Sequence, residues 1–135
     1  MRGNIDTRIS KLKNKEFDAI VLSLAGIQML NLVNEVKEVN PDIILTIGGG
    51  TPIDTVKVTQ LCIAKGIKTI EELKSITGKQ HNLNSSIRQI AVPTTLSGGE
   101  YSIIGGAMDT EKKLKEGYFG SDICPMVVIL DPHIA

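Results

Sequence analysis

The 135-residue chain has few aromatic residues, few cysteines and no excess charge, and each shortage excludes a class of function. It contains no tryptophan, and aromatic residues make up only 3%, so a base-stacking platform for nucleic acid is not expected. Fifteen Lys and Arg balance fifteen Asp and Glu, which argues against a nucleic-acid partner held by a broad basic field. No apolar run approaches the roughly 20 residues of a membrane span, so no membrane partner is expected either.

The cysteines, the histidines and the polar N-terminus indicate a cytoplasmic protein without a metal site of its own. Cys62 and Cys124 lack CxxC spacing and a neighbouring histidine, so we expect two reduced thiols. Residues 1–15 lack the apolar core of a signal peptide. His81 and His133 are isolated among loop-type residues, and surface or structural roles are expected for both.

Short aliphatic runs alternate with helical patterns, which predicts an α/β domain with a three-layer, mainly parallel, Rossmann-like sheet. The expected strands are 18–23, 43–47, 90–93, 103–108 and 126–130, and the expected helices are 6–15, 26–39, 52–64 and 67–75. The run 43–47 is almost wholly aliphatic, as in a strand covered on both faces. Residues 81–86 are expected to form a polar loop, and residues 112–119 a polar turn.

Three consecutive glycines, Gly48, Gly49 and Gly50, directly follow the most aliphatic of these strands. Without a Cβ they let the backbone turn sharply and approach a ligand closely. The helix that follows offers free N–H groups and the positive end of its dipole, which suits a pyrophosphate. Thr51 is the expected N-cap and Pro52 the expected first helical residue. The pattern is neither G-x-G-x-x-G nor a Walker A loop, and a well-capped glycine turn is the alternative.

Two charged residues follow in the same expected helix. Asp54 falls in its first turn, where a carboxylate stabilises a helix by itself. A carboxylate beside a pyrophosphate would repel it, so a ligand role for Asp54 means contact with a ribose or a nicotinamide amide. Lys57 lies one turn further on and is expected to be solvated or ion-paired.

A second loop, rich in hydroxyl groups and glycine, follows the strand 90–93 and runs from Thr94 to Glu100. Ligands of open α/β sheets bind at the carboxyl ends of the strands, so this loop and the triple-glycine loop are expected to face one crevice. Hydroxyl groups and glycine N–H groups suit the sugars and phosphates of a nucleotide. An ordinary polar loop is the alternative interpretation.

From about 42 to 132 the chain resembles the iron-containing (group III) alcohol dehydrogenase family, which includes maleylacetate-reductase-like members. The matching stretches, in family order, are IGGGTPIDTVK at 47–57, IAVPTTLSGGE at 90–100 and MVVILDP at 126–132. The resemblance implies an NAD(P)-dependent oxidoreductase that moves a hydride between the nicotinamide and a small alcohol or carbonyl substrate, while a metal polarises the substrate oxygen. It also implies a nucleotide-binding domain followed by a helical, metal-binding domain.

The same resemblance implies which residues bind the cofactor, NAD or NADP. They would be Gly48, Gly49, Gly50, Thr51, Asp54, Thr94, Thr95, Ser97, Gly98 and Lys115. The glycines and Thr51 would cradle the pyrophosphate, Asp54 would lie near the nicotinamide ribose, and Lys115 would reach a ribose. The four residues of the second loop would line the adenine and ribose side. The family's iron ligands, an Asp and several His, are expected beyond Ala135, so no catalytic residue is assigned and the chain alone is expected to be inactive.

Residues 1–32 resemble a different family, hydroxymethylbilane synthase (porphobilinogen deaminase). The matching stretches are RGNIDTR at 2–8, Lys11-Leu12 and FDAIVLSLAG at 17–26. The resemblance implies that Arg2 and Arg8 would hold carboxylates of a dipyrromethane cofactor. We therefore expect two segments, 1–33 and a nucleotide-binding domain at 34–135, as in a fusion of two partial genes.

Two alternatives to a dehydrogenase remain at this point. One is a fragment of a tetrapyrrole-synthesis enzyme, carried by the N-terminal segment. The other is a non-catalytic α/β module whose glycine loop binds some other phosphate ligand. Open sheet edges also allow a homo-oligomer.

Overall fold

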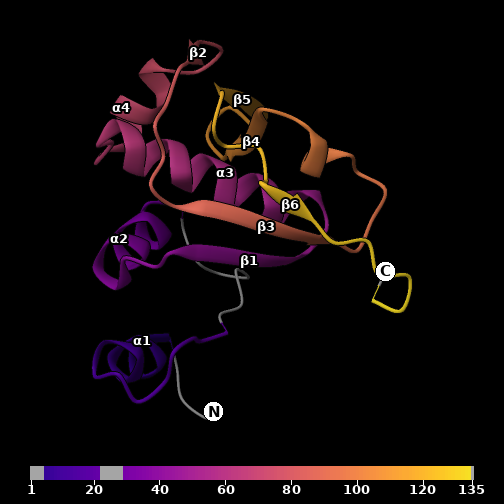
Figure 1. The fold of residues 1–135 in the computed structure, drawn as a ribbon. Coiled ribbons are helices and arrows are strands. Elements are labelled where there is room, and N and C mark those ends of the chain that lie inside the picture. Colours follow the sequence, from indigo (N-terminus) through magenta and orange to yellow (C-terminus); the bar gives the residue numbers. More distant parts are fainter. Residues whose placement is uncertain (1–4, 22–28, 135) are drawn as a thin grey trace.

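The computed structural model of the chain describes residues 5–21 and 29–134 (Figure 1). Its elements are α1 (Ile5–Lys13), α2 (Met29–Val39), β1 (Ile43–Gly48), α3 (Gly50–Lys65), α4 (Ile70–Ser75), β2 (Gln80–His81), β3 (Arg88–Pro93), the 3-10 turn η1 (Gly99–Tyr101), β4 (Ile104–Asp109), β5 (Leu114–Gly120) and β6 (Val127–Val128). The α/β class predicted from the sequence is confirmed. No helix within the described ranges is long and apolar enough to cross a membrane.

The strands form two sheets. The main sheet has the order β1-β3-β6 and is parallel throughout, with Ile43 opposite Arg88 and Gly48 opposite Pro93. The small sheet has the order β2-β5-β4, in which β4 and β5 form an antiparallel hairpin and β2 runs parallel to β5. Because β1 and β3 are parallel, the loops that follow them emerge at the same end of the main sheet, where the carboxyl ends of its strands lie.

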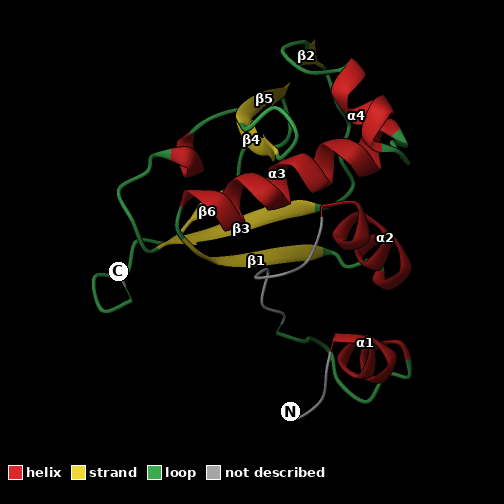
Figure 2. Ribbon diagram, turned by 180° about the vertical axis from the view of Figure 1, so that it is seen from behind, coloured by secondary structure: helices red, strands yellow, loops and turns green. Residues whose placement is uncertain are grey.

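Helix α3 lies between the main sheet and the β4–β5 hairpin, as Figure 2 shows from behind. Because it is covered on two sides, α3 is buried nearly continuously from Ile53 to Cys62, and this buried run mixes apolar residues with polar ones. The buried polar residues are Asp54, Lys57, Thr59 and Gln60. Its apolar side chains pack against Val33 of α2, Tyr118 of β5 and Ile123. This packing fixes the start of α3 beside the carboxyl ends of the strands, where the two loops emerge.

The predicted strand 18–23 does not form at residues 18–21, and residues 22–23 lie outside the described residues. Val21 is 80% exposed, and its carbonyl accepts a 2.7 Å hydrogen bond from Arg8 Nη1. A short aliphatic run becomes a strand only where a partner strand completes its hydrogen bonds, and no ladder forms at residues 18–21. The predicted helix 26–39 is found from Met29, and residues 26–28 also lie outside the described residues.

The predicted turn 112–119 is wrong over most of its length, because residues 114–120 form β5. Its polar residues Lys115 and Glu116 hide the alternation typical of a strand, but pairing with β4 satisfies the backbone. The predicted final strand 126–130 is reduced to β6, and most of this run is exposed, with Leu130 at 67%.

The aliphatic run of β1 is covered on one face only. Thr46 is buried against Gln89, whose Nε2 donates to Thr46 Oγ1 at 2.8 Å. Ile43, Leu45 and Ile47 alternate with it and are 47%, 56% and 58% exposed. The prediction of a strand covered on both faces is therefore wrong for the described residues, and the main sheet has an open apolar face.

Candidate functional site

The two strand-end loops lie against each other, as the parallel sheet predicts. The backbone N–H of Thr94 donates to the carbonyl of Gly48 at 2.9 Å. A Cβ placed on Gly49 would lie 3.1 Å from two side-chain atoms of Thr95, and one on Gly50 would lie 3.1 Å from Cβ and Oγ of Ser97. Both contacts are tighter than a Cβ normally makes, so glycine at these positions permits the close approach of the loops.

Helix α3 begins earlier than predicted. Its N-cap is Gly49, with extended backbone angles, so Thr51 is the second helical residue and not the N-cap. Gly49 has no side chain to cap the helix, and no side-chain hydrogen bond closes this end. The first N–H groups of a helix have no partner within it, so the start of α3 presents uncapped donors and the positive end of the dipole. This end fits an anionic group such as a phosphate.

The backbone before this helix also depends on glycine. Gly48 has a φ of +154°, and a Cβ there would lie 2.6 Å from Cγ of Pro52. A larger residue at position 48 would push the first turn of α3 away from the main sheet. The glycine loop is therefore shaped by steric limits on both of its sides.

An open groove of about 430 Å³ lies beside these loops, between α3 and the β4–β5 hairpin. It is lined by Asp54, Ser97, Gly98, Gly99, Ser102, Ile104, Gly106, Lys115, Glu116 and Gly117. Four of the predicted site residues are in this lining: Asp54, Ser97, Gly98 and Lys115. The other six, Gly48, Gly49, Gly50, Thr51, Thr94 and Thr95, are not in it and belong to the adjoining loops and the first turn of α3.

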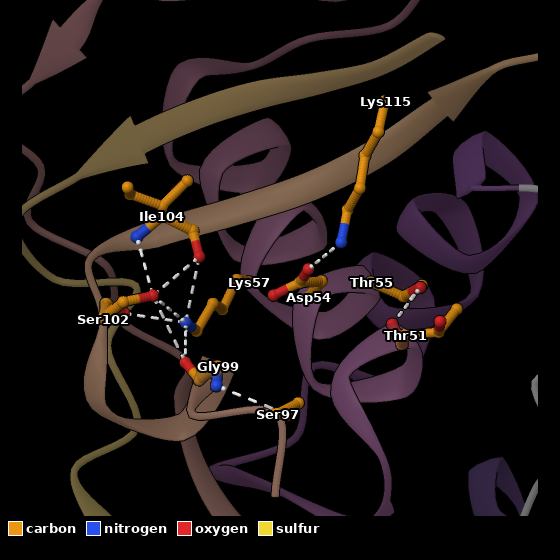
Figure 3. A network of polar contacts seen from close by, with 9 residues as sticks. All are labelled: Thr51, Asp54, Thr55, Lys57, Ser97, Gly99, Ser102, Ile104 and Lys115. Atoms are coloured by element: carbon orange, nitrogen blue, oxygen red, sulfur yellow. Dashed lines mark hydrogen bonds and ion pairs between the residues drawn. The ribbon is translucent and has the colours of Figure 1, made fainter. Parts of the chain in front are cut away.

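An ion pair crosses the groove from the hairpin to the helix. Lys115 Nζ lies 2.9 Å from Oδ2 of Asp54 (Figure 3). The Asp54 side chain is 11% exposed and the Lys115 side chain 59%. Asp54 is the fifth residue of α3, one turn past the position where a carboxylate caps a helix, so the predicted first-turn placement is wrong. The ammonium group instead compensates a largely buried negative charge.

Lys57 lies behind the groove and is fully buried, which contradicts the expectation of a solvated or ion-paired lysine. Figure 3 shows its Nζ surrounded by oxygens of Gly99, Ser102 and Ile104. Nζ donates to the Ser102 carbonyl at 2.7 Å, to Ser102 Oγ at 3.1 Å and to the Ile104 carbonyl at 3.0 Å. Burial lowers the pKa of Lys57, and the nearby charge of Asp54 opposes that shift. The ammonium group ties η1 to the start of β4 and so holds one wall of the groove.

No group of three or more His, Cys, Asp or Glu side chains in residues 5–21 and 29–134 could hold a metal ion. His133 is exposed near the C-terminal end, and His81 lies on the short β2. Cys62 and Cys124 are both free, Cys62 being buried. The described residues therefore do not fit an iron site.

Sequence reasoning missed the hairpin wall of the groove, which includes Gly106, Glu116 and Gly117. The missed signal is a glycine on each of two neighbouring strands: Gly106 and Gly117 are direct cross-strand partners. Glycine inside a strand marks a close approach of another group. That pairing becomes visible only once residues 114–120 are known to be a strand.

A family model, described as iron-containing alcohol dehydrogenase, matches residues 4–132 of the chain. Among curated proteins, dehydrogenase FUM7 of Gibberella moniliformis is 30% identical over 131 residues, which cover 89% of this chain and 31% of the relative. The chain therefore spans about a third of the length of this relative.

Porphobilinogen deaminases are also similar to the chain. The protein from Campylobacter fetus is 65% identical over 37 residues, covering 27% of this chain and 12% of the relative. The one from Campylobacter jejuni subsp. doylei is 34% identical over 134 residues, covering 96% of this chain and 38% of the relative.

The fold is similar to that of several solved structures. The iron-containing alcohol dehydrogenase of Thermococcus thioreducens matches with a TM-score of 0.66 and 25% identity, over 93% of this chain and 35% of that one. Sulfoacetaldehyde reductase from Bifidobacterium kashiwanohense, solved in complex with NAD+, matches with a TM-score of 0.63 and 19% identity, over 78% of this chain and 28% of that one.

Proposed function

Because the chain belongs to the iron-containing alcohol dehydrogenase family, we propose that it is the nucleotide-binding part of an NAD(P)-dependent oxidoreductase acting on a small alcohol or carbonyl compound. We further propose that the 135-residue chain binds NAD(P) in the cytoplasm without turning substrate over.

One observation carries the proposal: the uncapped, side-chain-free start of α3 and the hydroxyl-rich loop after β3 meet beside the groove. A dinucleotide needs donors for its pyrophosphate and polar groups for its sugars. The N–H groups of Gly50 and Thr51 would bind the pyrophosphate at the helix start. Thr94, Thr95, Ser97 and Gly98 would line the adenine and ribose side.

The groove would receive the nicotinamide half. Asp54 would accept hydrogen bonds from ribose hydroxyls, and Lys115 would donate to the same sugar while neutralising Asp54. Lys57 would hold the Gly99–Ser102 wall in place without touching the ligand. When bound, the nicotinamide supplies the hydride chemistry, and the residues of this chain supply binding and orientation.

The experiment is a titration of the chain with NADH and NADPH, followed by nicotinamide fluorescence, for the wild type and Gly49→Asp. The aspartate would crowd Thr95 and place a negative charge at the helix start, so we expect saturable binding to weaken at least roughly tenfold. Asn84→Asp is the matched control, because it adds the same charge at an exposed position in the loop before β3, and its affinity should equal that of the wild type.

Three results would contradict the proposal. If the folded wild-type chain binds neither nucleotide, the claim that it binds NAD(P) is contradicted. Equal affinity for NADH, ATP and inorganic phosphate would favour a general phosphate-binding module. Alcohol-dependent reduction of NAD(P) by the chain itself would remove the claim that it does not turn over.

A second candidate function concerns the N-terminal segment, and the 65% identity to a porphobilinogen deaminase over 37 residues favours it. We propose that residues 1–33 derive from a protein of that type and that residues 34–135 form the nucleotide-binding domain. This boundary falls inside α2, so one helix joins the two segments. Arg8 already donates to the Val21 carbonyl, and Arg2 lies outside the described residues.

Calorimetric titration with a dipyrromethane carrying acetate and propionate groups tests this candidate. If the segment retains a polycarboxylate site, the ligand should bind and Arg8→Ala should abolish binding. Absence of binding to the folded wild-type chain would reject this function for the segment.

A further inference from the structure

Gly106 of β4 lies directly beneath the side chain of Lys115. A Cβ on Gly106 would lie 2.0 Å from Cε and 2.8 Å from Nζ of Lys115, and 3.1 Å from Oδ2 of Asp54. The first of these distances is far inside van der Waals contact. Alanine at this position and the observed Lys115 conformation therefore exclude each other.

The register of the hairpin explains this contact. Met108 lies opposite Lys115, and Gly106 lies opposite Gly117, so Gly106 and Lys115 are diagonal neighbours on adjacent strands. Diagonal neighbours lie within reach of a long side chain. Lys115 uses that reach to cross β4 toward α3, where its ammonium group meets Asp54.

Most of the Lys115 side chain is exposed, at 59%, so little packing restrains it from the solvent side. Solvated lysine side chains sample several rotamers, and holding one of them costs conformational entropy. The open space above Gly106 and the carboxylate of Asp54 are thus the features that select this rotamer.

We propose that Gly106 is a positioning residue, which provides the space that seats Lys115 on Asp54 and keeps the ammonium group in the groove. This inference deepens the proposed function, on which it rests, by naming a residue that controls the charge presented to the nucleotide. With Lys115 displaced, the largely buried Asp54 carboxylate faces the groove alone and repels a phosphate-bearing ligand.

The first experiment needs no ligand and compares four chains by thermal unfolding: wild type, Gly106→Ala, Lys115→Ala and the double variant. Gly106→Ala displaces the flexible end of Lys115, so in the wild-type background it should lower the melting temperature by as much as loss of the ion pair does in Lys115→Ala. Lys115→Ala removes the clashing atoms, so the same change should cost much less in that background. If Gly106→Ala fails to fold, a folded double variant gives the same support, and an unfolded double variant overturns the proposal.

Gly105→Ala is the matched control. A Cβ at this neighbouring position would meet Cβ of Lys57, Cγ2 of Val58 and the Asp54 carbonyl at 3.0, 3.0 and 3.2 Å. None of these atoms belongs to Lys115, so its loss of stability should persist in the Lys115→Ala background. If Gly105→Ala and Gly106→Ala each lower the stability equally in the wild-type and Lys115→Ala backgrounds, the proposal that Gly106 positions Lys115 is overturned.

The second experiment measures NADH affinity by nicotinamide fluorescence for the same four chains. Gly106→Ala and Lys115→Ala should each weaken binding by roughly tenfold, and the double variant should be no weaker than either. The two experiments separate the two proposals. If the wild type does not bind NADH, the proposed function fails, while the unfolding comparison still tests whether Gly106 positions Lys115. If NADH binds but the losses of the two substitutions are additive, only the positioning role of Gly106 is rejected.

Discussion

At the residue scale, the structure places two lysines of the site in opposite environments. Lys57 is sealed behind the groove and bound by uncharged oxygens, whereas Lys115 is exposed and paired with a carboxylate. The ammonium of Lys57 compensates for its burial by donating to several oxygens at once, those of Gly99, Ser102 and Ile104. The rigidity of the groove wall and the charge inside the groove are thus assigned to different residues.

Lys57→Met should destabilise the chain. Methionine has a similar length but cannot donate, so the carbonyls of Ser102 and Ile104 would lose a buried partner, at a cost of about 1–3 kcal/mol. Urea unfolding followed by circular dichroism measures this cost. Lys65→Met, at the exposed end of the same helix, is the control and should change stability by less than about 0.5 kcal/mol. Equal stability of the two variants would contradict this role of Lys57.

The pH dependence of the same comparison has a definite sign. The pKa of Lys57 is lowered in the folded chain, so with rising pH the folded state loses this proton before the unfolded state does. In that interval the unfolded chain binds more protons, and stability rises with pH. The wild type should therefore gain stability relative to Lys57→Met as the pH increases toward the usual lysine pKa. A difference that stays flat or falls would show that the folded chain does not lower this pKa.

At the element scale, a helix that is too short to be stable alone needs its ends fixed. Helix α4 has six residues and begins with a capping box. The N–H of Glu72 donates to Thr69 Oγ1 at 3.2 Å, and the Glu72 carboxylate accepts from the N–H groups of Thr69 at 3.3 Å and Lys68 at 2.7 Å. Leu73 is then held in the core beside α3.

Thr69→Ala should cost about 1 kcal/mol of stability, because it removes one half of this box. Amide hydrogen exchange is the sharper measurement: exchange at Glu72 should accelerate while the amides of β3 keep their rates. Thr69→Ser is the control, since serine restores the hydroxyl acceptor. Unchanged exchange at Glu72 in the alanine variant would contradict the role of this cap.

The sequence predicts those elements whose signal is local. Strand β1, helix α3 and strand β3 follow from aliphatic runs and the glycines between them, and the meeting of their loops follows from parallel pairing. Strand β5 was missed because its polar residues face the groove and its glycine makes room for a neighbour. Lys57 was misjudged because its partners lie 42 to 47 positions away, in a turn that no local pattern places beside it.

At the scale of the whole molecule, the three layers are the main sheet, the helices α2 and α3, and the small sheet (Figures 1 and 2). Within the described residues the outer face of the main sheet is left open. Ile43, Leu45 and Ile47 of β1 are exposed there, and both edges of this sheet are unpaired in the described chain. Exposed apolar strands at a sheet edge promote association.

Replacing both Leu45 and Ile47 with glutamate should therefore reduce self-association of the chain. Sedimentation velocity over a range of protein concentrations measures it, and the circular dichroism spectrum should stay unchanged because neither side chain is part of the core. Leu114→Glu is the control, as Leu114 is similarly exposed, at 61%, on the small sheet. A wild-type chain that remains monomeric throughout the range would contradict the prediction.

The two sheets also differ in how far apart their paired residues lie along the chain, and this difference has a consequence for synthesis. In the hairpin the paired residues that lie closest in the sequence are Asp109 and Leu114. In the main sheet, Ile43 of β1 pairs with Arg88, which is far later in the sequence. Closing a long loop costs more entropy than closing a short one, so the hairpin can form as soon as its own residues are made. On the ribosome, the glycine loop after β1 emerges well before β3 and remains without its neighbour in the meantime. Chaperones that bind nascent apolar strands would therefore meet β1 first, during the interval in which its open face and its unpaired edge are exposed together.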